Sequence, residues 1–228
     1  MGHIKKRTVL ILRAVLNCVL IIIFFGLPLL LPAGTLRFWN AWLFLILFDA
    51  CFLTILVYLA SKNPEYAEKR FRGNETERPQ RIVMRLLVAS ALLMLLVAGF
   101  DYRFHWSSVP VVVVGIAAAL IVAGFVMLFF VMRQNSYASR VVEIQKNQEV
   151  IDSGMYSWVR HPMYLAFSVI FVLSPTVLGS WYSLIPAACI PTLLTFRISN
   201  EEKVLMAGLR GYDAYTRKVR YRLIPFVW

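Results

Sequence analysis

Acidic residues and cysteines are scarce in this chain of 228 residues. The 12 Asp and Glu residues stand against 24 Lys and Arg, which gives a net charge of +12. Cys18, Cys51 and Cys189 lie in apolar segments with no second cysteine at metal-ligand spacing, so we predict neither a disulfide nor a metal site. No nucleic-acid-binding motif accompanies the positive charge. Contact with anionic membrane lipids is therefore the expected reason for it.

Long polar segments are also rare, because 60% of the residues are hydrophobic. Such a composition is typical of a bilayer-embedded protein. A long apolar region at 163–196 is interrupted by Ser174-Pro175 and Gly179-Ser180, which predicts a helical hairpin with arms Met163–Leu178 and Trp181–Arg197. Four other segments approach the ~20 residues that a membrane-spanning helix needs: Val9–Leu31, Trp39–Ala60, Ile82–Phe100 and Val109–Met132. We therefore predict an all-α, polytopic integral membrane bundle of four spans plus a C-terminal hairpin.

The basic residues orient this bundle, because Lys and Arg accumulate at the cytoplasmic ends of membrane spans. With the N-terminus inside, the outer loops carry only Arg37 and Arg103, and every other Lys and Arg lies in inner segments or at inner helix ends. Both termini are therefore expected in the cytoplasm. Asp49, alone in the middle of the second span, is expected to face other helices or a wet cavity rather than lipid.

We expect two regions along the chain. Residues 1–132 form the N-terminal transmembrane helices and contain the loop 61–81, which is typical of an interfacial helix and is also consistent with a lid over a pocket. Residues 133–228 hold the polar motifs and a cytosolic tail. Within them, Val141–Ile144 resembles a short extended piece and Gly154–Tyr156 a turn.

The motif Arg160-His161-Pro162-Met163-Tyr164 precedes the predicted hairpin, and Glu201-Glu202 follows it. A proline after His161 favours a helix that begins at Pro162, where the free N–H groups of the first turn attract an anion. The carboxylates offer a place for a cation. Folding back the hairpin would unite both functions around a zwitterionic amino-acid group such as that of S-adenosylmethionine. As alternatives, His161 only caps the helix, and the glutamates only pair with nearby basic residues.

These residues carry a resemblance to a known family. Arg160–Tyr164, the spacing to Glu201-Glu202-x-x-Leu205, and the tail Gly211-Tyr212-x-x-Tyr215 with Arg222–Pro225 resemble the isoprenylcysteine carboxyl methyltransferase family, especially its short prokaryotic members. The resemblance covers residues 132–225 and implies transmembrane helices with a cytosolic pocket for S-adenosylmethionine, in a bacterial or archaeal cytoplasmic membrane. It also implies a lipidic acceptor that enters from the bilayer.

The resemblance also implies roles for single residues. His161 and Tyr164 would contact the methionyl part of the cofactor, and Glu201 or Glu202 its ammonium. The full set of implied cofactor-binding residues is Asn135, Gly154, Tyr156, Arg160, His161, Pro162, Tyr164, Glu201 and Glu202. Arg197, Arg222 and Glu202 are the residues assigned to catalysis, the two arginines as groups that orient an acidic acceptor. Tyr212, Tyr215 and Trp228 are also consistent with anchors at the membrane interface.

The predicted function is methyl transfer from S-adenosylmethionine to a lipidic or small membrane-partitioning acceptor, most simply at a carboxylate. A carboxylate is ionised at neutral pH and needs no base, whereas an amine acceptor would need His161 or a glutamate to remove a proton. Two alternatives remain: an NADPH-dependent membrane reductase of the sterol-reductase type, and a non-enzymatic membrane protein. The sequence shows no additional basic pocket for a 2′-phosphate, which disfavours the reductase.

Overall fold

The computed structural model describes residues 2–62, 78–137, 144–145 and 147–228, without the side chains of residues 2–15, 17 and 18. Across those ranges the regular structure is entirely helical. In chain order the helices are α1 (Gly2–Ala33), α2 (Trp39–Lys62), α4 (Arg78–Phe104), α5 (Val111–Gln134), the short 3₁₀ helix η1 (Gly154–Ser157), α6 (Pro162–Val177), α7 (Leu184–Gly208) and α8 (Tyr212–Lys218). Most of the loop 61–81 and of the piece Val141–Ile144 lie outside the described residues.

Within the described residues, three helices are long and apolar enough to cross a membrane. They are α2, α4 and α5, with 24, 27 and 24 residues. Shorter apolar helices occur at Val19–Ala33 and at Pro162–Val177. The prediction of an all-α integral membrane protein is therefore confirmed, and the predicted spans coincide with helices. The number of spans and the cytoplasmic placement of both termini stay predictions.

The predicted hairpin is present as α6 and α7, joined by a turn at residues 178–183. Its second arm continues past Arg197 to Gly208, further than the apolar run indicates. The reason is local propensity, because Glu, Lys, Leu and Met in the segment 201–206 are good helix formers even after the apolar run has ended. Consequently Glu201 and Glu202 lie on the same rigid helix as Arg197.

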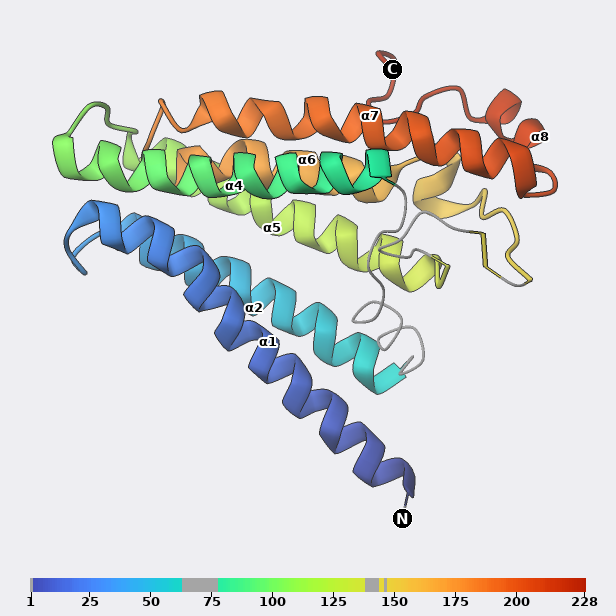
Figure 1. The fold of residues 1–228 in the computed structure, drawn as a ribbon, viewed down its shortest axis with the longest axis horizontal. Coiled ribbons are helices and arrows are strands. Elements are labelled where there is room, and N and C mark those ends of the chain that lie inside the picture. Colours follow the sequence, from blue (N-terminus) through green and yellow to red (C-terminus); the bar gives the residue numbers. More distant parts are fainter. Residues whose placement is uncertain (1, 63–77, 138–143, 146) are drawn as a thin grey trace.

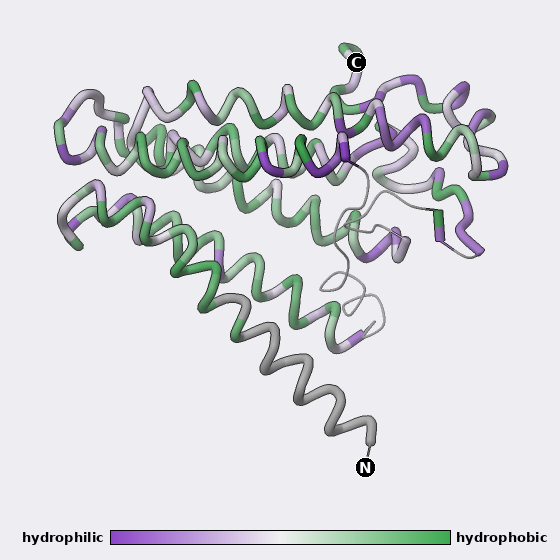
Figure 2. Tube along the Cα trace, viewed as in Figure 1, coloured by the Kyte–Doolittle hydropathy of each residue, from purple (hydrophilic) through white to green (hydrophobic). Residues whose placement is uncertain are grey.

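The helices form a layered body from which one hairpin diverges. In Figure 1, α4, α5, α6 and α7 run side by side, whereas the α1–α2 hairpin tilts away from them toward the N-terminus. Helix α5 packs on α6, and α4 packs on α7 and α1. Figure 2 shows hydrophobic residues along the helices and hydrophilic ones gathered where α7, α8 and the loop before η1 meet. The polar motifs of the sequence are thus concentrated at one end of the body.

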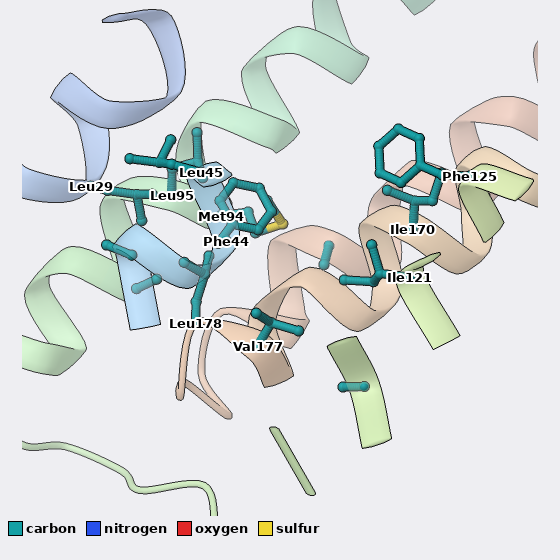
Figure 3. Packing of buried hydrophobic residues seen from close by; sticks show 14 of the residues in the cluster. Leu29, Phe44, Leu45, Met94, Leu95, Ile121, Phe125, Ile170, Val177 and Leu178 are labelled. Atoms are coloured by element: carbon teal, nitrogen blue, oxygen red, sulfur yellow. The ribbon is translucent and has the colours of Figure 1, made fainter. Parts of the chain in front are cut away.

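Close packing fixes α6, the helix that begins at the histidine motif. Figure 3 shows part of the apolar core, in which Phe125 and Ile121 of α5 lie near Ile170 of α6. At Gly124 an added Cβ would lie 2.9 Å from Ile170 Cγ1, so the absence of a side chain lets the two helices approach. Small residues at helix interfaces are typical of membrane proteins, where close contact drives helix association.

A cluster of polar side chains holds the hairpin turn at the end of the body opposite the site. The buried Asp101 carboxylate accepts hydrogen bonds from the Ser107 backbone N–H at 2.7 Å, from the Ser107 hydroxyl at 2.6 Å and from the Ser180 hydroxyl. Ser183 in the same turn donates to the Met94 carbonyl at 2.7 Å. The turn is therefore tied to α4 by groups that satisfy each other.

Asp49 lies on α2 and is half-buried. Its Oδ1 atom is buried and has no hydrogen-bond partner among the described residues. This placement agrees with the expectation that Asp49 faces away from lipid.

Candidate functional site

The site forms where three segments meet: the start of α6, the last turns of α7, and the chain after α8. As the sequence predicts, α6 begins at Pro162, and His161 is its N-cap with an extended φ of −124°. The backbone N–H of Arg160 donates to the Tyr221 carbonyl and that of His161 to the Arg222 carbonyl, both at 2.9 Å. The C-terminal tail therefore lies directly against the histidine motif and holds it in place.

Glu202 is buried and has nitrogen atoms of three side chains around its carboxylate. Its Oε1 accepts from Arg160 Nε at 2.7 Å and lies 3.3 Å from His161 Nε2, and its Oε2 lies 2.8 Å from Arg222 Nε. Burial alone would raise the pKa of Glu202. The hydrogen bond with His161 and the charges of His161, Arg160 and Arg222 outweigh burial together, so the pKa falls below its usual value. The carboxylate is therefore ionised and fully engaged by its partners.

Glu201, the neighbouring carboxylate, belongs to a second hydrogen-bond chain. The Tyr164 hydroxyl donates to Glu201 Oε2 at 2.7 Å and accepts from Arg197 Nε at 2.9 Å. Arg197 also donates through a terminal nitrogen to Gln80 Oε1 at 3.1 Å. Since Tyr164, Arg197 and Gln80 are all at least 95% buried, this chain is rigid and links α4 to the end of α7.

A third group of contacts connects α5 to η1 and α8. Asn135, at the C-terminal end of α5, donates to the Tyr156 hydroxyl at 2.9 Å. The Tyr215 hydroxyl donates to the Tyr156 carbonyl at 2.8 Å. Gly154 has a φ of +54°, which favours glycine, and opens the predicted turn beside Gln134. These contacts place the aromatic ring of Tyr156 in the wall of the site.

The three groups surround one pocket of about 860 Å³, a volume that includes its open mouth. Eight of the predicted site residues line it: Asn135, Tyr156, Arg160, His161, Pro162, Tyr164, Arg197 and Glu201. Gly154, Glu202 and Arg222 do not line it, although Glu202 contacts the wall residues Arg160 and His161. The hairpin thus brings the histidine motif and the glutamates together.

Several wall residues were not predicted to line a binding site. They include Tyr137, the segment Gln148–Ile151, Leu205, Leu209, Tyr212 and Tyr215. Gln80, which contacts Arg197, was also missed because a glutamine at the start of an apolar helix carries no recognisable signal. Tyr212 and Tyr215 are each only 4% exposed. Their interpretation as interfacial anchors is therefore wrong, and the family-like tail motif was the signal that could have placed them in the site.

The pocket offers groups of both charges. Glu201 presents a carboxylate, whereas Arg160, Arg197 and His161 present nitrogen donors. Among the described residues no group of three His, Cys, Asp or Glu side chains is arranged to hold a metal ion. An organic ligand with neighbouring positive and negative groups suits this wall better than a simple ion does, because each of its charges would meet a partner of opposite charge or a hydrogen-bond donor.

Comparisons with known proteins agree with this geometry. The sequence model of the isoprenylcysteine carboxyl methyltransferase (ICMT) family matches residues 115–207, which include α6, the histidine motif and both glutamates. Among solved structures, the fold is similar to that of the eukaryotic intramembrane Ras methyltransferase ICMT, with a TM-score of 0.52 and 16% sequence identity over 98% of this chain and 86% of that one. A comparison with curated protein sequences gave no match. The part of the chain that is similar to this family contains α6 and most of α5 and α7, the helices that build the pocket, and the likeness to the solved structure is one of fold.

Proposed function

We propose that this protein uses S-adenosylmethionine to methylate a carboxylate of a lipidic or small membrane-partitioning acceptor. The observation that carries the proposal is the pairing, in one pocket wall, of the Glu201 carboxylate with the nitrogen donors of Arg160, His161 and Arg197. An amino-acid group carries an ammonium and a carboxylate on one carbon. A wall with both kinds of partner fits that group without leaving a buried charge unpaired.

The two glutamates have different roles in this proposal. Glu201 lines the pocket and is the residue that would bind the ammonium of the cofactor. Glu202 already accepts from Arg160 and contacts His161 and Arg222, so it positions these groups rather than touching the ligand. The sequence predicts a catalytic role for Glu202. In this proposal Glu202 instead holds Arg160, His161 and Arg222 in position.

Arg197 is the residue that would orient the acceptor carboxylate. Its Nε donates to Tyr164 and a terminal nitrogen donates to Gln80, which holds the guanidinium plane fixed in the pocket wall. Arg222 instead contacts Glu202 and lies over the Trp228 ring, with its Cζ atom 5.2 Å from the ring centroid. A fixed guanidinium recognises a carboxylate through paired hydrogen bonds. Arg197 therefore suits acceptor recognition better than Arg222.

The chemistry asks the protein mainly for alignment and exclusion of water. When bound, S-adenosylmethionine supplies a methyl carbon on a sulfonium, and its transfer to an ionised carboxylate gives a methyl ester and S-adenosylhomocysteine with no proton to move. No residue then needs to act as a base. Apolar wall residues such as Met163, Val204 and Leu205 help to keep water away from the acceptor. By the distribution of basic residues, the pocket would open toward the cytoplasm.

Binding of S-adenosylhomocysteine to the detergent-purified protein, measured by isothermal titration calorimetry, tests the proposal. We expect micromolar affinity, loss of binding in Glu201→Gln and His161→Ala, and unchanged binding in Asp213→Asn, a control on the exposed surface of α8. Incubating native membranes with methyl-labelled cofactor and the protein should then yield a base-labile, labelled lipid-phase product. Tight binding of NADPH with none of S-adenosylhomocysteine would refute the proposal.

A further inference from the structure

Tyr212 carries a buried hydroxyl with no hydrogen-bond partner among the described residues. The residue is the first of α8 and is only 4% exposed. Tyr215, equally buried on the same helix, donates its hydroxyl to the Tyr156 carbonyl at 2.8 Å. Native proteins rarely leave a buried polar group unpaired unless a ligand or a function accounts for it. The difference between these two tyrosines therefore points to a partner that is not part of the chain.

The position of Tyr212 indicates where that partner binds. Tyr212 lines the same pocket as Glu201, His161 and Arg160. Burial is the main cause that raises the pKa of Tyr212, and the nearby charges of Glu202 and Glu201 raise it further. The hydroxyl thus keeps its proton throughout the physiological range and is available as a donor.

We infer that the Tyr212 hydroxyl binds the carboxylate of the cofactor's amino-acid group while Glu201 binds the ammonium beside it. This inference rests on the proposed function and extends it to a residue that was not among the predicted cofactor-binding residues. The nitrogen donors of Arg160 and His161 in the same wall make that part of the pocket favourable for an anion. Because the ammonium and the carboxylate share one carbon, a donor next to Glu201 is well placed for the carboxylate.

The unliganded protein should tolerate loss of this hydroxyl. Tyr212→Phe removes a buried donor that has no partner among the described residues, so none of those residues loses a hydrogen bond. We expect the melting temperature without ligand to be equal to that of the wild type or higher. The gain in melting temperature at saturating S-adenosylmethionine should be smaller than in the wild type, because the cofactor then binds more weakly.

The sharpest test compares two ligands that differ only in the carboxylate: S-adenosylmethionine and its decarboxylated form. Both are measured on the full-length protein in detergent, by displacement of radiolabelled S-adenosylhomocysteine. Tyr212→Phe should weaken S-adenosylmethionine about 10- to 100-fold, the usual effect of one hydrogen bond to a charged group. It should leave the affinity for the decarboxylated form unchanged. Tyr58→Phe, which changes a tyrosine packed against Phe129 away from the pocket, is the matched control and should alter neither.

Each outcome decides a different question. Equal weakening of both ligands in Tyr212→Phe would overturn the assignment to the carboxylate, and wild-type affinity for both would overturn any role of Tyr212 in binding. A wild-type protein that binds neither S-adenosylmethionine nor S-adenosylhomocysteine would refute the proposed function itself. If the wild type binds S-adenosylmethionine and the Tyr212→Phe variant binds it with the same affinity, the inference fails while the proposed function is retained.

Discussion

Replacing Glu202 by glutamine should destabilise the folded protein more than any change at the neighbouring Glu201. The substitution keeps the size of the side chain and removes its charge. Arg160, whose side chain is 8% exposed, then loses its carboxylate contact at 2.7 Å, and His161 and Arg222 lose theirs. The guanidinium of Arg160 keeps the carbonyls of Thr216 and Val219 as acceptors, at 3.4 and 3.1 Å, but these carry no net charge.

The size of the effect follows from burial. Removing one partner of a buried ion pair typically costs ~3–5 kcal/mol, because a charge is left uncompensated in the interior. The lower end applies here, since the side chain of Arg222 is 38% exposed and water can replace part of its interaction. About 3 kcal/mol in a protein of this length corresponds to a decrease in melting temperature of roughly 6–12 °C.

The assay is thermal unfolding of the detergent-purified variants, followed by circular dichroism at 222 nm. Asp213→Asn, which removes the partner of Arg217 in an exposed pair, is the control and should melt like the wild type. The double variant Arg160→Met, Glu202→Gln should lose less stability than the sum of the two single variants, because the buried guanidinium of Arg160 is then no longer left without its carboxylate. Unfolding of Glu202→Gln within 2 °C of the wild type (roughly 1 kcal/mol or less) would refute the reasoning.

Three further predictions concern the pH dependence of stability, the packing of α5 against α6, and the hydrogen bonds of Asp101. The pKa of Glu202 is lower in the folded protein than its ordinary value of 4.5. The ionised carboxylate therefore contributes its full stabilisation above pH 4.5, and this stabilisation is lost as the pH falls through the pKa of the folded state. The melting temperature should accordingly fall only under acidic conditions. Gly124→Ala should destabilise the protein by ~1–3 kcal/mol, since the new methyl would lie 2.9 Å from Ile170, whereas Gly115→Ala, with no atom within 4 Å, should be neutral or stabilising in the same denaturation assay. Asp101→Ala should leave the hydroxyls that it binds unpaired and cost ~2–4 kcal/mol, and wild-type melting would contradict its structural role.

The sequence allowed the helices to be predicted because each one depends mainly on a contiguous apolar run. The start of α6 was also predictable, since Pro162 restricts the residue before it and fits the first turn. The end of α7 was not, because hydrophobicity falls at Arg197 while helix propensity continues to Gly208. Contacts between distant segments, such as Gln80 with Arg197, leave no periodic signal in one sequence and appear only when α4 and α7 pack together.

The adjacent glutamates show why the site itself was only partly predictable. Consecutive residues on an α-helix differ in direction by ~100°, so Glu201 and Glu202 face different surroundings although the sequence presents them as a pair. Glu201 points into the pocket beside Tyr164, whereas Glu202 meets the tail residue Arg222 and does not line the pocket. Which of them faces which surroundings depends on the rotation of α7, and that rotation is fixed by its packing on α4 and α6. A carboxylate that binds a ligand and one that organises the basic groups around it can thus be neighbours in sequence, and only the packing of the helix assigns the roles.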